Sequence, residues 1–561
     1  MHFSLRLPQP PPPPYKLFSF LKLLLAACCF IAHFPAKDLR SLLVDNEGGG
    51  GGGGAFKFFI YEWPKEYGDV YPDAASPLVA DSPYNHGFRS NSGAGDLLDP
   101  SLGLFQTWQF SLYANVMSRL LVSRHRTRNA SLATSFIIPF DAGVHSYVDK
   151  LTGKYRLATP YGWNVIRWLQ EAQSSTGPAA SAGFWRHYGH DHFVLFSLTV
   201  FVQTGIGVKE FFKGVCQNCS VLAIETTPTR TSTLYHRSRK YWYAVPYPSS
   251  YHWYEGIPEL PWSVSHQSRD ILCLFIGSVQ TKNIAANAVR RALRTQCNNT
   301  RLYPSYNNNN NNNTCIWHST SHSCNGVVDA VEPMRLFKRA KFCLTPPGDT
   351  VTRKSLFDAL VAGCIPVIFA KATISQYVWF FSEQEIEDVA VYIPVSSVMT
   401  GQMDVMLFLS AMSDRDVRRK QLAIERIAPR LQYSVVPRRI SQHINISAAA
   451  GESSTYSMDP TVVWEPPLVD AVDILIERML DPRTVEPRGG FSVDQRRAHK
   501  CLQNDLISYH PDYGGLFKSG TVTLAAGKLW RNIKCLIPNP NSPFLNSSVP
   551  VNTIVDAGIL A

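Results

Sequence analysis

The chain has 561 residues, of which 45% are apolar and 12% aromatic, and this is more than one hydrophobic core usually organises, so we expect two packed domains. Its net charge is +11, but lysines and arginines are interleaved with acidic residues and form no dense basic run, so we expect no nucleic-acid partner. A diffuse basic surface suits a protein that handles anionic ligands.

The N-terminal residues have the composition of a targeting segment. Residues 17–34 are an apolar stretch close to the short limit for a membrane span. A cleaved signal peptide would have a shorter apolar core and a small-x-small cleavage site, for which Ala26-Ala27 is a weak match. We therefore predict a cytosolic tail at 1–16, a signal-anchor transmembrane helix at 17–34 and a Gly-rich stem at 35–56. Basic residues lie on both sides of the stretch, so charge leaves its orientation open.

Glycosylation sequences and cysteines indicate a lumenal body. Six N-x-[ST] sequences begin at Asn129, Asn218, Asn298, Asn312, Asn445 and Asn546, and ten cysteines follow the apolar stretch. Cys216 and Cys219 form a CxxC pair without evident partners for a zinc site, which leaves a disulfide or two buried thiols.

The body alternates strands with helices. Strands are predicted at Phe58 to Tyr61, Ser135 to Phe140 and His192 to Phe196, with a helix at Trp108 to Val122. A second alternating block begins at Ile271 to Gly277 and continues through a helix at Ala288 to Cys297. The pattern predicts an α/β protein with two parallel, helix-flanked sheets and a ligand cleft between them. We set the domains at 57–262 and 263–480, with a tail of unknown fold at 481–561. Asn307 to Asn313 is expected to be a loop insertion.

The segment FCLTPPGDTVTRKSLFDALVAGCIPVIF, residues 342–369, predicts a βαβ unit. Phe342 to Thr345 is a strand, Thr352 to Val361 a helix with Gly363 after its end, and Ile365 to Phe369 a second strand. A helix N-terminus after a Gly-containing loop attracts anions, and Arg353 can add a bidentate contact to a diphosphate. Asp358 suits ribose hydroxyls. The alternative is that Asp358 pairs with Lys354 at i+4 and that Asp349 caps the turn.

Residues 346–367 resemble the exostosin-like glycosyltransferases (GT47), specifically the plant xyloglucan galactosyltransferase branch, with P-P-G-D-[ST]-x-T-R-[RK]-S-x-F-D-[SA] followed by A-G-C-I-P-V. Weaker similarities follow the same order along residues 57–480. They are Ile60 to Pro64, Gln109 to Leu112, Ile137 to Phe140, Gly189 to Phe193, Leu274 to Gly277, Arg290 to Cys297 and Gln376 to Trp379.

The resemblance implies a GT-B fold, in which two Rossmann-like domains face a cleft, an N-terminal acceptor-side domain and a C-terminal domain that binds a UDP-sugar. It implies inversion at the anomeric carbon and a Golgi membrane protein, single-pass type II, with a lumenal catalytic body. The expected donor-binding residues are Gly277, Arg290, Gly348, Asp349, Thr350, Arg353, Ser355 and Asp358. The acceptor would be a cell-wall or matrix polysaccharide or a glycoprotein glycan, with galactose the favoured sugar, and complexes with other glycosyltransferases are compatible with the resemblance.

The catalytic base is assigned to Asp191 and His192, because the pair precedes an apolar strand whose end should face the cleft. Packing of His192 and a bracing role for Asp191 are the alternative. The family usually has Arg where His190 stands, which puts the local geometry in question.

No metal is expected to be required. Asp414-Arg415-Asp416 has the letters of a D-x-D motif, but Ser413 before it predicts a helix N-cap with an acidic first turn. A chain-extending exostosin transferase of the xylan or heparan type and a non-catalytic lumenal scaffold that binds glycans are the alternative functions.

Overall fold

The computed structural model describes residues 56–61, 93–141, 168–169, 189–198, 211–212, 216–226, 241–264, 269–278, 280–281, 283–299, 314–319, 331–441 and 462–481. The predicted anchor, the stem up to residue 55, the asparagine run and the tail after residue 481 lie outside these ranges. Within them, no helix combines the length and the apolar composition that a membrane crossing needs. The described helices and strands all belong to one compact unit, residues 57–561.

The first sheet has six parallel strands in the order β4-β1-β5-β6-β7-β8. They are β1 (Phe58–Ile60), β4 (Arg126–Thr127), β5 (Ser135–Asp141), β6 (His192–Phe196), β7 (Ser220–Ala223) and β8 (Trp242–Ala244). Every residue of β5, β6 and β7 is buried, as in a sheet covered on both faces. The continuous apolar runs that predicted β5 and β6 have this cause.

The second sheet has five parallel strands in the order β10-β9-β11-β12-β13. They are β9 (Ile271–Gly277), β10 (Thr314–Ser319), β11 (Ala340–Thr345), β12 (Ile365–Ile368) and β13 (Val391–Tyr392). In each sheet, the strand that comes second along the chain lies on one side of the first strand, and all later strands lie on its other side. The strand order therefore reverses at β1 in the first sheet and at β9 in the second. Open α/β sheets bind ligands at the carboxyl ends of the strands on either side of such a reversal. In the second sheet these are the carboxyl ends of the paired strands β9 and β11.

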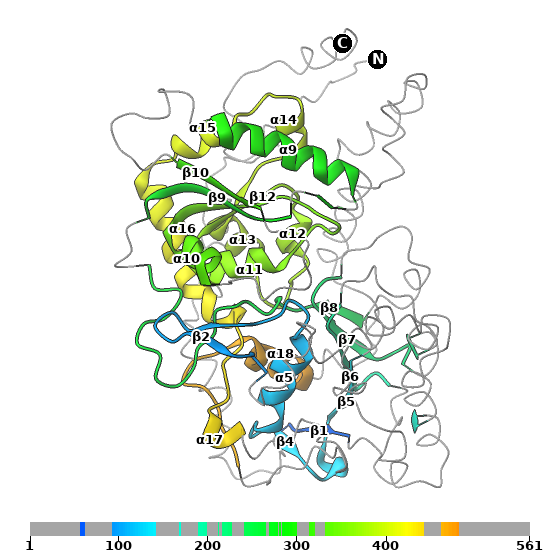
Figure 1. Cartoon of the computed structure of the whole chain (residues 1–561). Helices are drawn as coiled ribbons and strands as arrows, with labels where there is room; N and C mark the ends of the chain where they lie inside the picture. Colours follow the sequence, from blue (N-terminus) through cyan, green and yellow to red (C-terminus); the bar gives the residue numbers. More distant parts are fainter. Residues whose placement is uncertain are drawn as a thin grey trace, which may run out of the picture. The chain divides into compact units, whose positions relative to one another are not determined.

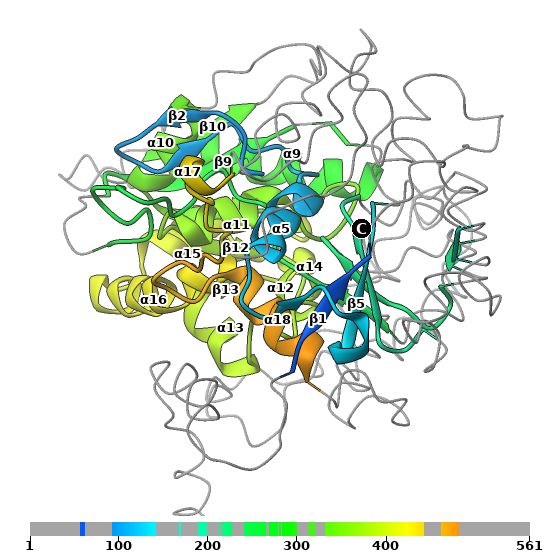
Figure 2. The same ribbon diagram turned by 90° about the horizontal axis from the view of Figure 1, so that it is seen from below.

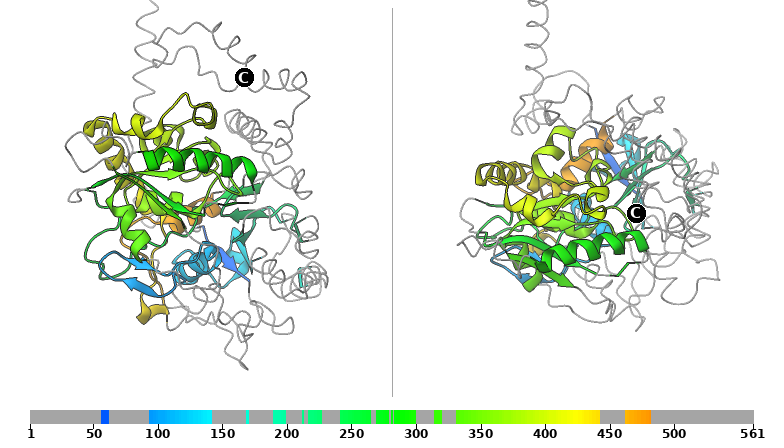
Figure 3. Two further views of the ribbon diagram at one scale, coloured as in Figure 1. Left: turned by 45° about the horizontal axis from the view of Figure 1, so that its top comes forward. Right: turned by 90° about the horizontal axis from the view of Figure 1, so that it is seen from above.

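Helices cover both faces of the second sheet (Figure 1). On one face lie α9 (Ile284–Asn299), α14 (Val395–Met399) and α15 (Val405–Ser410), and on the other α10 (Val331–Arg339), α11 (Lys354–Val361) and α16 (Asp414–Ile427). Figure 3 shows α9 extended along its face of the sheet. The remaining described elements are β2 (Leu97–Asp99), β3 (Leu104–Phe105), α5 (Leu112–Leu121), η4 (Ala130–Leu132), α12 (Ala372–Ser375), α13 (Glu383–Val389), η11 (Ala428–Leu431), α17 (Arg438–Ser441) and α18 (Ala471–Leu480).

The last described helix, α18, packs against α5, which belongs with the first sheet (Figure 2). Arg119 of α5 is fully buried, and its Nε lies 3.2 Å from Asp470 Oδ2, while its Nη2 lies 3.0 Å from Asp473 Oδ1. Ser135 at the start of β5 donates to the carbonyl of Met479. The chain thus returns to the first sheet before residue 480. The domain boundaries at 57–262 and 263–480 stay a prediction.

β6 and β9 have the predicted ends, whereas the predicted helices have shifted ends. The helix expected from Ala288 begins at Ile284. The helix expected from Trp108 begins at Leu112, and the one expected from Thr352 begins at Lys354. Arg353 is therefore the N-cap residue of α11, with extended backbone, and is not in its first turn. Gly363 follows the C-cap with φ +73°, as the sequence predicted, and an added Cβ there would lie 2.6 Å from Val264 Cγ1.

Candidate functional site

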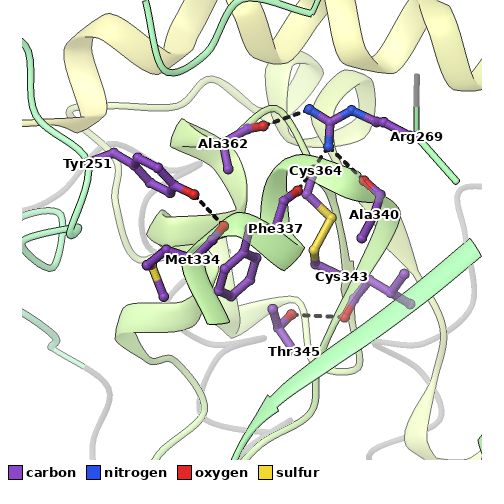
Figure 4. Close-up of a disulfide and its surroundings, with 10 residues drawn as sticks. Tyr251, Arg269, Met334, Phe337, Ala340, Cys343, Thr345, Ala362 and Cys364 are labelled. Atoms are coloured by element: carbon purple, nitrogen blue, oxygen red, sulfur yellow. Dashed lines mark hydrogen bonds between the residues drawn. A yellow bond between two sulfur atoms is a disulfide. The ribbon is translucent and has the colours of Figure 1, made fainter. Parts of the chain in front are cut away.

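A disulfide and a buried arginine fix the βαβ unit of residues 340–368 (Figure 4). Cys343 of β11 is bonded to Cys364, which follows the end of α11. Arg269 is buried and donates to the carbonyls of Phe337 at 3.0 Å, Ala340 at 2.7 Å and Ala362 at 2.7 Å. One guanidinium thus binds the C-terminal carbonyls of both α10 and α11, where a positive charge is favoured. These contacts fix the amino-terminal edge of the unit, opposite the loop between β11 and α11, which lies at the carboxyl edge of the second sheet.

Arg290 spans the point where the strand order reverses. It lies on α9, is 1% exposed, and its Nε donates to Pro347 O after β11 at 3.0 Å. Its Nη1 donates to the carbonyl of Ser278, the residue that follows β9. The guanidinium also lies over the ring of Phe275, 5.6 Å from the centroid. Arg290 therefore joins the two strand ends between which doubly wound sheets bind ligands.

The side chain of Arg353, at the N-cap of α11, also lies close to the loop after β11. An added Cβ at Gly348 would lie 2.1 Å from Arg353 Nη2 and 2.8 Å from Arg290 Nη2, so both guanidinium groups lie against this glycine. Only a residue without a side chain permits this approach. Within the described part of the chain, no hydrogen-bond partner is present for Arg290 Nη2, Arg353 Nε or the Oγ of Ser355, although all three atoms are buried.

The pKa values of both arginines are lowered. Burial and the neighbouring Arg353 lower the pKa of Arg290 to about 9, while Asp349 opposes this effect. Burial also lowers the pKa of Arg353, and Tyr247, Asp349 and Glu225 oppose it. Two close, partly desolvated cations with unused donors favour an anion that accepts bidentate hydrogen bonds, such as a phosphate.

The carboxylate of Asp358 is engaged by protein groups. Its Oδ1 accepts from Ser249 Oγ at 2.9 Å, from the Ser250 N–H at 2.9 Å and from Lys354 Nζ at 2.8 Å. The i+4 pair with Lys354 that the sequence left as the alternative is thus present. Asp358 ties α11 to the segment that follows β8, and its contact with a ribose stays a prediction.

The remaining predicted donor-binding residues gather around the same loop. Thr350 donates its hydroxyl to Thr352 O at 2.9 Å, and its own carbonyl accepts from the Gly348 N–H at 2.9 Å. Asp349 is exposed, and Gly277 is the last residue of β9. The structure therefore places seven of the eight predicted donor-binding residues at the β9 end, in the loop after β11 or in the first two turns of α11, and the side chain of the eighth, Arg290, reaches the strand ends from α9.

The family model for the exostosin GT47 domain matches residues 53–403, from before β1 to just after α14. The chain belongs to the exostosin GT47 family. It is a glycosyltransferase, as its family and relatives indicate.

Several Arabidopsis thaliana proteins are similar to this chain. The probable xyloglucan galactosyltransferase GT13 is 27% identical over 364 residues, 62% of this chain and 69% of that protein. The probable xyloglucan galactosyltransferase GT19 is 29% identical over 331 residues, 55% of this chain and 68% of that protein. The xyloglucan-specific galacturonosyltransferase 1 is 26% identical over 392 residues, 67% and 53% of the two chains. The solved glycosyltransferase CalG4 aligns with 55% of this chain and 89% of its own at 12% identity, but with a TM-score of 0.22 this likeness is too slight to assign a fold.

Asp191 and His192 lie in the core of the first sheet. Both are fully buried, and His192 Nδ1 lies 2.7 Å from Asp191 Oδ1 while its Nε2 lies 2.9 Å from Tyr61 Oη. The imidazole stacks on Phe136, with ring centroids 5.0 Å apart. His192 is the first residue of β6, so the pair lies at the amino end of that strand. This is the packed arrangement left open above, and a catalytic role for the pair stays a prediction.

Asp414 and Asp416 occupy the first turn of α16. The Ser413 side chain accepts from the Asp416 N–H at 3.1 Å, which is the predicted N-cap. Among the residues that the structure describes, no group of three or more His, Cys, Asp or Glu side chains is arranged to hold a metal ion.

Sequence reasoning missed Glu225, a buried carboxylate that follows β7. Tyr247 donates its hydroxyl to Glu225 Oε2 at 3.3 Å. The residues on either side of Glu225 bond to side chains after α12, because Tyr377 donates to Ile224 O at 2.8 Å and the Thr226 N–H donates to Gln376 Oε1 at 2.9 Å. A lone acidic residue after a four-residue apolar strand was the available signal.

Proposed function

We propose that the chain transfers a sugar, with galactose favoured, from a UDP-sugar to a plant cell-wall polysaccharide. The names of similar proteins support this, because two are probable xyloglucan galactosyltransferases. Another is a xyloglucan-specific galacturonosyltransferase. A test of the donor sugar must therefore include UDP-uronic acids beside UDP-galactose. Donor choice depends on a few contacts to the sugar and varies within one fold.

The convergence of Arg290 and Arg353 on Gly348 carries the proposal. In a GT-B arrangement of two Rossmann-like halves, the diphosphate would occupy the carboxyl ends of β9 and β11. Arg290 Nη2, Arg353 Nε and Ser355 Oγ would donate to its oxygens, and the N-terminus of α11 would add its partial positive charge. Two guanidinium groups can stabilise the departing diphosphate without a metal ion.

The reaction exchanges one bond for another at the anomeric carbon. The acceptor oxygen forms a bond to this carbon from the face opposite the diphosphate, which inverts the configuration. The bond to the β-phosphate oxygen breaks, its electron pair leaves with UDP, and the acceptor proton passes to a base.

We also propose a lumenal catalytic body anchored in the Golgi membrane as a type II protein. Three disulfides within the described residues support an oxidising compartment, and they join Cys216 to Cys219, Cys297 to Cys315 and Cys343 to Cys364. A fusion of residues 1–56 to a fluorescent reporter tests this: colocalisation with a Golgi marker is expected, and a secreted reporter would contradict it.

A donor screen tests the proposed function. The purified chain is titrated with a panel of UDP-sugars in EDTA, and UDP release is followed with and without xyloglucan oligosaccharides. One UDP-sugar should bind to the wild type, bind at least tenfold more weakly to Arg353→Ala and Arg290→Ala, and bind normally to Arg339→Ala, which changes an exposed arginine paired with Asp270. A folded protein that binds no UDP-sugar would instead fit a non-catalytic scaffold.

A further inference from the structure

The carboxylate of Glu225 lies at the edge of the first sheet where ligands are expected. Glu225 follows Ala223, the last residue of β7, in a fully parallel sheet. Ala223 is in register with Phe196, the last residue of β6, whereas His192 is the first residue of that strand. At about 3.3 Å per residue, the two strand ends are roughly 13 Å apart. Glu225 is thus at the carboxyl edge, and Asp191 and His192 are toward the opposite edge.

The loop that carries Glu225 is clamped on both sides by residues associated with the second sheet. Tyr377 donates to the carbonyl of Ile224, and Gln376 accepts from the N–H of Thr226. Both of these residues follow α12, which itself comes after β12. The clamp holds one short turn of the first sheet against the part of the chain that carries the donor-binding loop, and Glu225 is the residue between the two bonds.

Glu225 also lies within electrostatic reach of the guanidinium that is proposed to bind the diphosphate. Its charge counteracts the burial that lowers the pKa of Arg353. Tyr247, which donates to Glu225, has a pKa raised well above 10 by burial and by the charge of Glu225, so it keeps its proton and its donor role. Asp141, another carboxylate at this edge, accepts instead from the backbone N–H of Ser197 within the first sheet.

We propose that Glu225 is the catalytic base that takes the proton of the acceptor hydroxyl. This inference rests on the proposed function, since the anomeric carbon is bonded to the β-phosphate and must lie next to the guanidinium pair. The acceptor O–H proton moves to a carboxylate oxygen of Glu225 as the acceptor oxygen bonds to the anomeric carbon and UDP leaves with its electron pair. Tyr247 fixes Oε2, and this orients the carboxylate.

Glu225 has no exposed surface, so the acceptor reaches it only when the contacts around it part. The hydrogen bonds at Ile224 and Thr226 would have to open for this, because they hold the turn that carries Glu225 against the residues after α12. When they close again around the substrates, the carboxylate is shielded from water.

The test compares Glu225→Gln with Asp141→Asn, a matched change at the same edge, and with Asp191→Asn. UDP affinity is measured by calorimetry, and UDP release from UDP-galactose is measured with xyloglucan oligosaccharides. We expect Glu225→Gln to bind UDP within about threefold of the wild type while its kcat falls about 10²- to 10⁴-fold, as for loss of a general base. Asp141→Asn should keep its kcat within about fivefold.

The opposing results are distinct. A Glu225→Gln protein with near-normal kcat, or one that loses UDP binding together with activity, overturns the base assignment. So does an Asp191→Asn protein that alone loses activity while it binds UDP. A wild type that binds no UDP refutes the proposed function instead. If Glu225→Gln does not fold, Glu225→Asp is used, and a carboxylate moved back by one methylene should lower kcat at unchanged UDP affinity.

Discussion

Arg353 Nη2 lies 2.1 Å from the point that a Cβ atom of Gly348 would occupy. This contact explains why the loop after β11 has a glycine where no left-handed backbone demands one: the missing side chain makes room for a guanidinium.

Gly348→Ala should therefore impair the donor site. The methyl group would displace Arg353 and also contact Arg290, so we expect UDP affinity to fall at least tenfold with little change in the melting temperature. The measurement is a calorimetric titration beside a thermal melt. Gly256→Ala is the control, since it adds a methyl group in open space at φ +96° and should lower stability alone. Unchanged UDP affinity in Gly348→Ala would refute the packing argument.

The disulfide between Cys343 and Cys364 should stabilise the unit that presents this loop. It closes a segment with a sequence separation of 21, for which chain entropy predicts about 3 kcal/mol. We expect Cys343→Ala with Cys364→Ala to lower the free energy of unfolding by about that amount, measured by chemical denaturation. Cys273→Ala, which removes a buried free thiol, controls for the loss of a sulfur atom. Equal losses in the two proteins would mean that the cross-link contributes little.

Arg119 should be essential for docking α18 onto α5. Without Arg119, the buried carboxylate of Asp470 would lose its cationic partner. Loss of one partner of a buried ion pair lowers the free energy of unfolding by about 3–5 kcal/mol. Arg119→Met is therefore expected to unfold at a much lower denaturant concentration than Arg124→Met, whose arginine pairs with Glu465 at the surface. Similar midpoints for the two variants would contradict this account.

The same cluster predicts a pH dependence of stability. Burial and the charge of Asp470 raise the pKa of Asp473 to about 7, above its unfolded value near 4. The folded protein then binds more protons than the unfolded chain between these values, so this group's contribution to stability is present below about pH 4 and is lost as the pH rises to 7. Denaturation at pH 5 and pH 8 should show a smaller decrease for Asp473→Asn than for the wild type. A decrease of equal size in both proteins would exclude Asp473 as the cause.

How far the sequence predicted the structure depends on whether the signal was local. Apolar runs such as His192–Phe196 and Ile271–Gly277 predicted β6 and β9 with their observed ends, because strands buried on both faces need continuous apolar residues. The segment at 342–369 likewise predicted β11, α11 and β12. Helix starts were predicted less well, because those expected at Trp108 and Thr352 were set too early and the one expected at Ala288 was set too late.

Long-range partners could not be predicted in the same way. Asp358 had two possible roles in the sequence, and its bonds to Ser249 and Ser250 arise from a segment more than a hundred residues earlier. Glu225 escaped notice because a single acidic residue after a short strand has no distinctive spacing. Its position is evident only in the structure, where the turn after β7 lies against residues that follow α12.

The most direct test of the central claim compares UDP with uridine as ligands of the wild type and of Arg290→Met with Arg353→Met. If the guanidinium pair binds the diphosphate, the wild type should bind UDP at least a hundredfold more tightly than uridine, and the double variant should lose that preference while its uridine affinity stays within about threefold. A double variant that is folded and keeps the full preference for UDP would show that the diphosphate binds elsewhere.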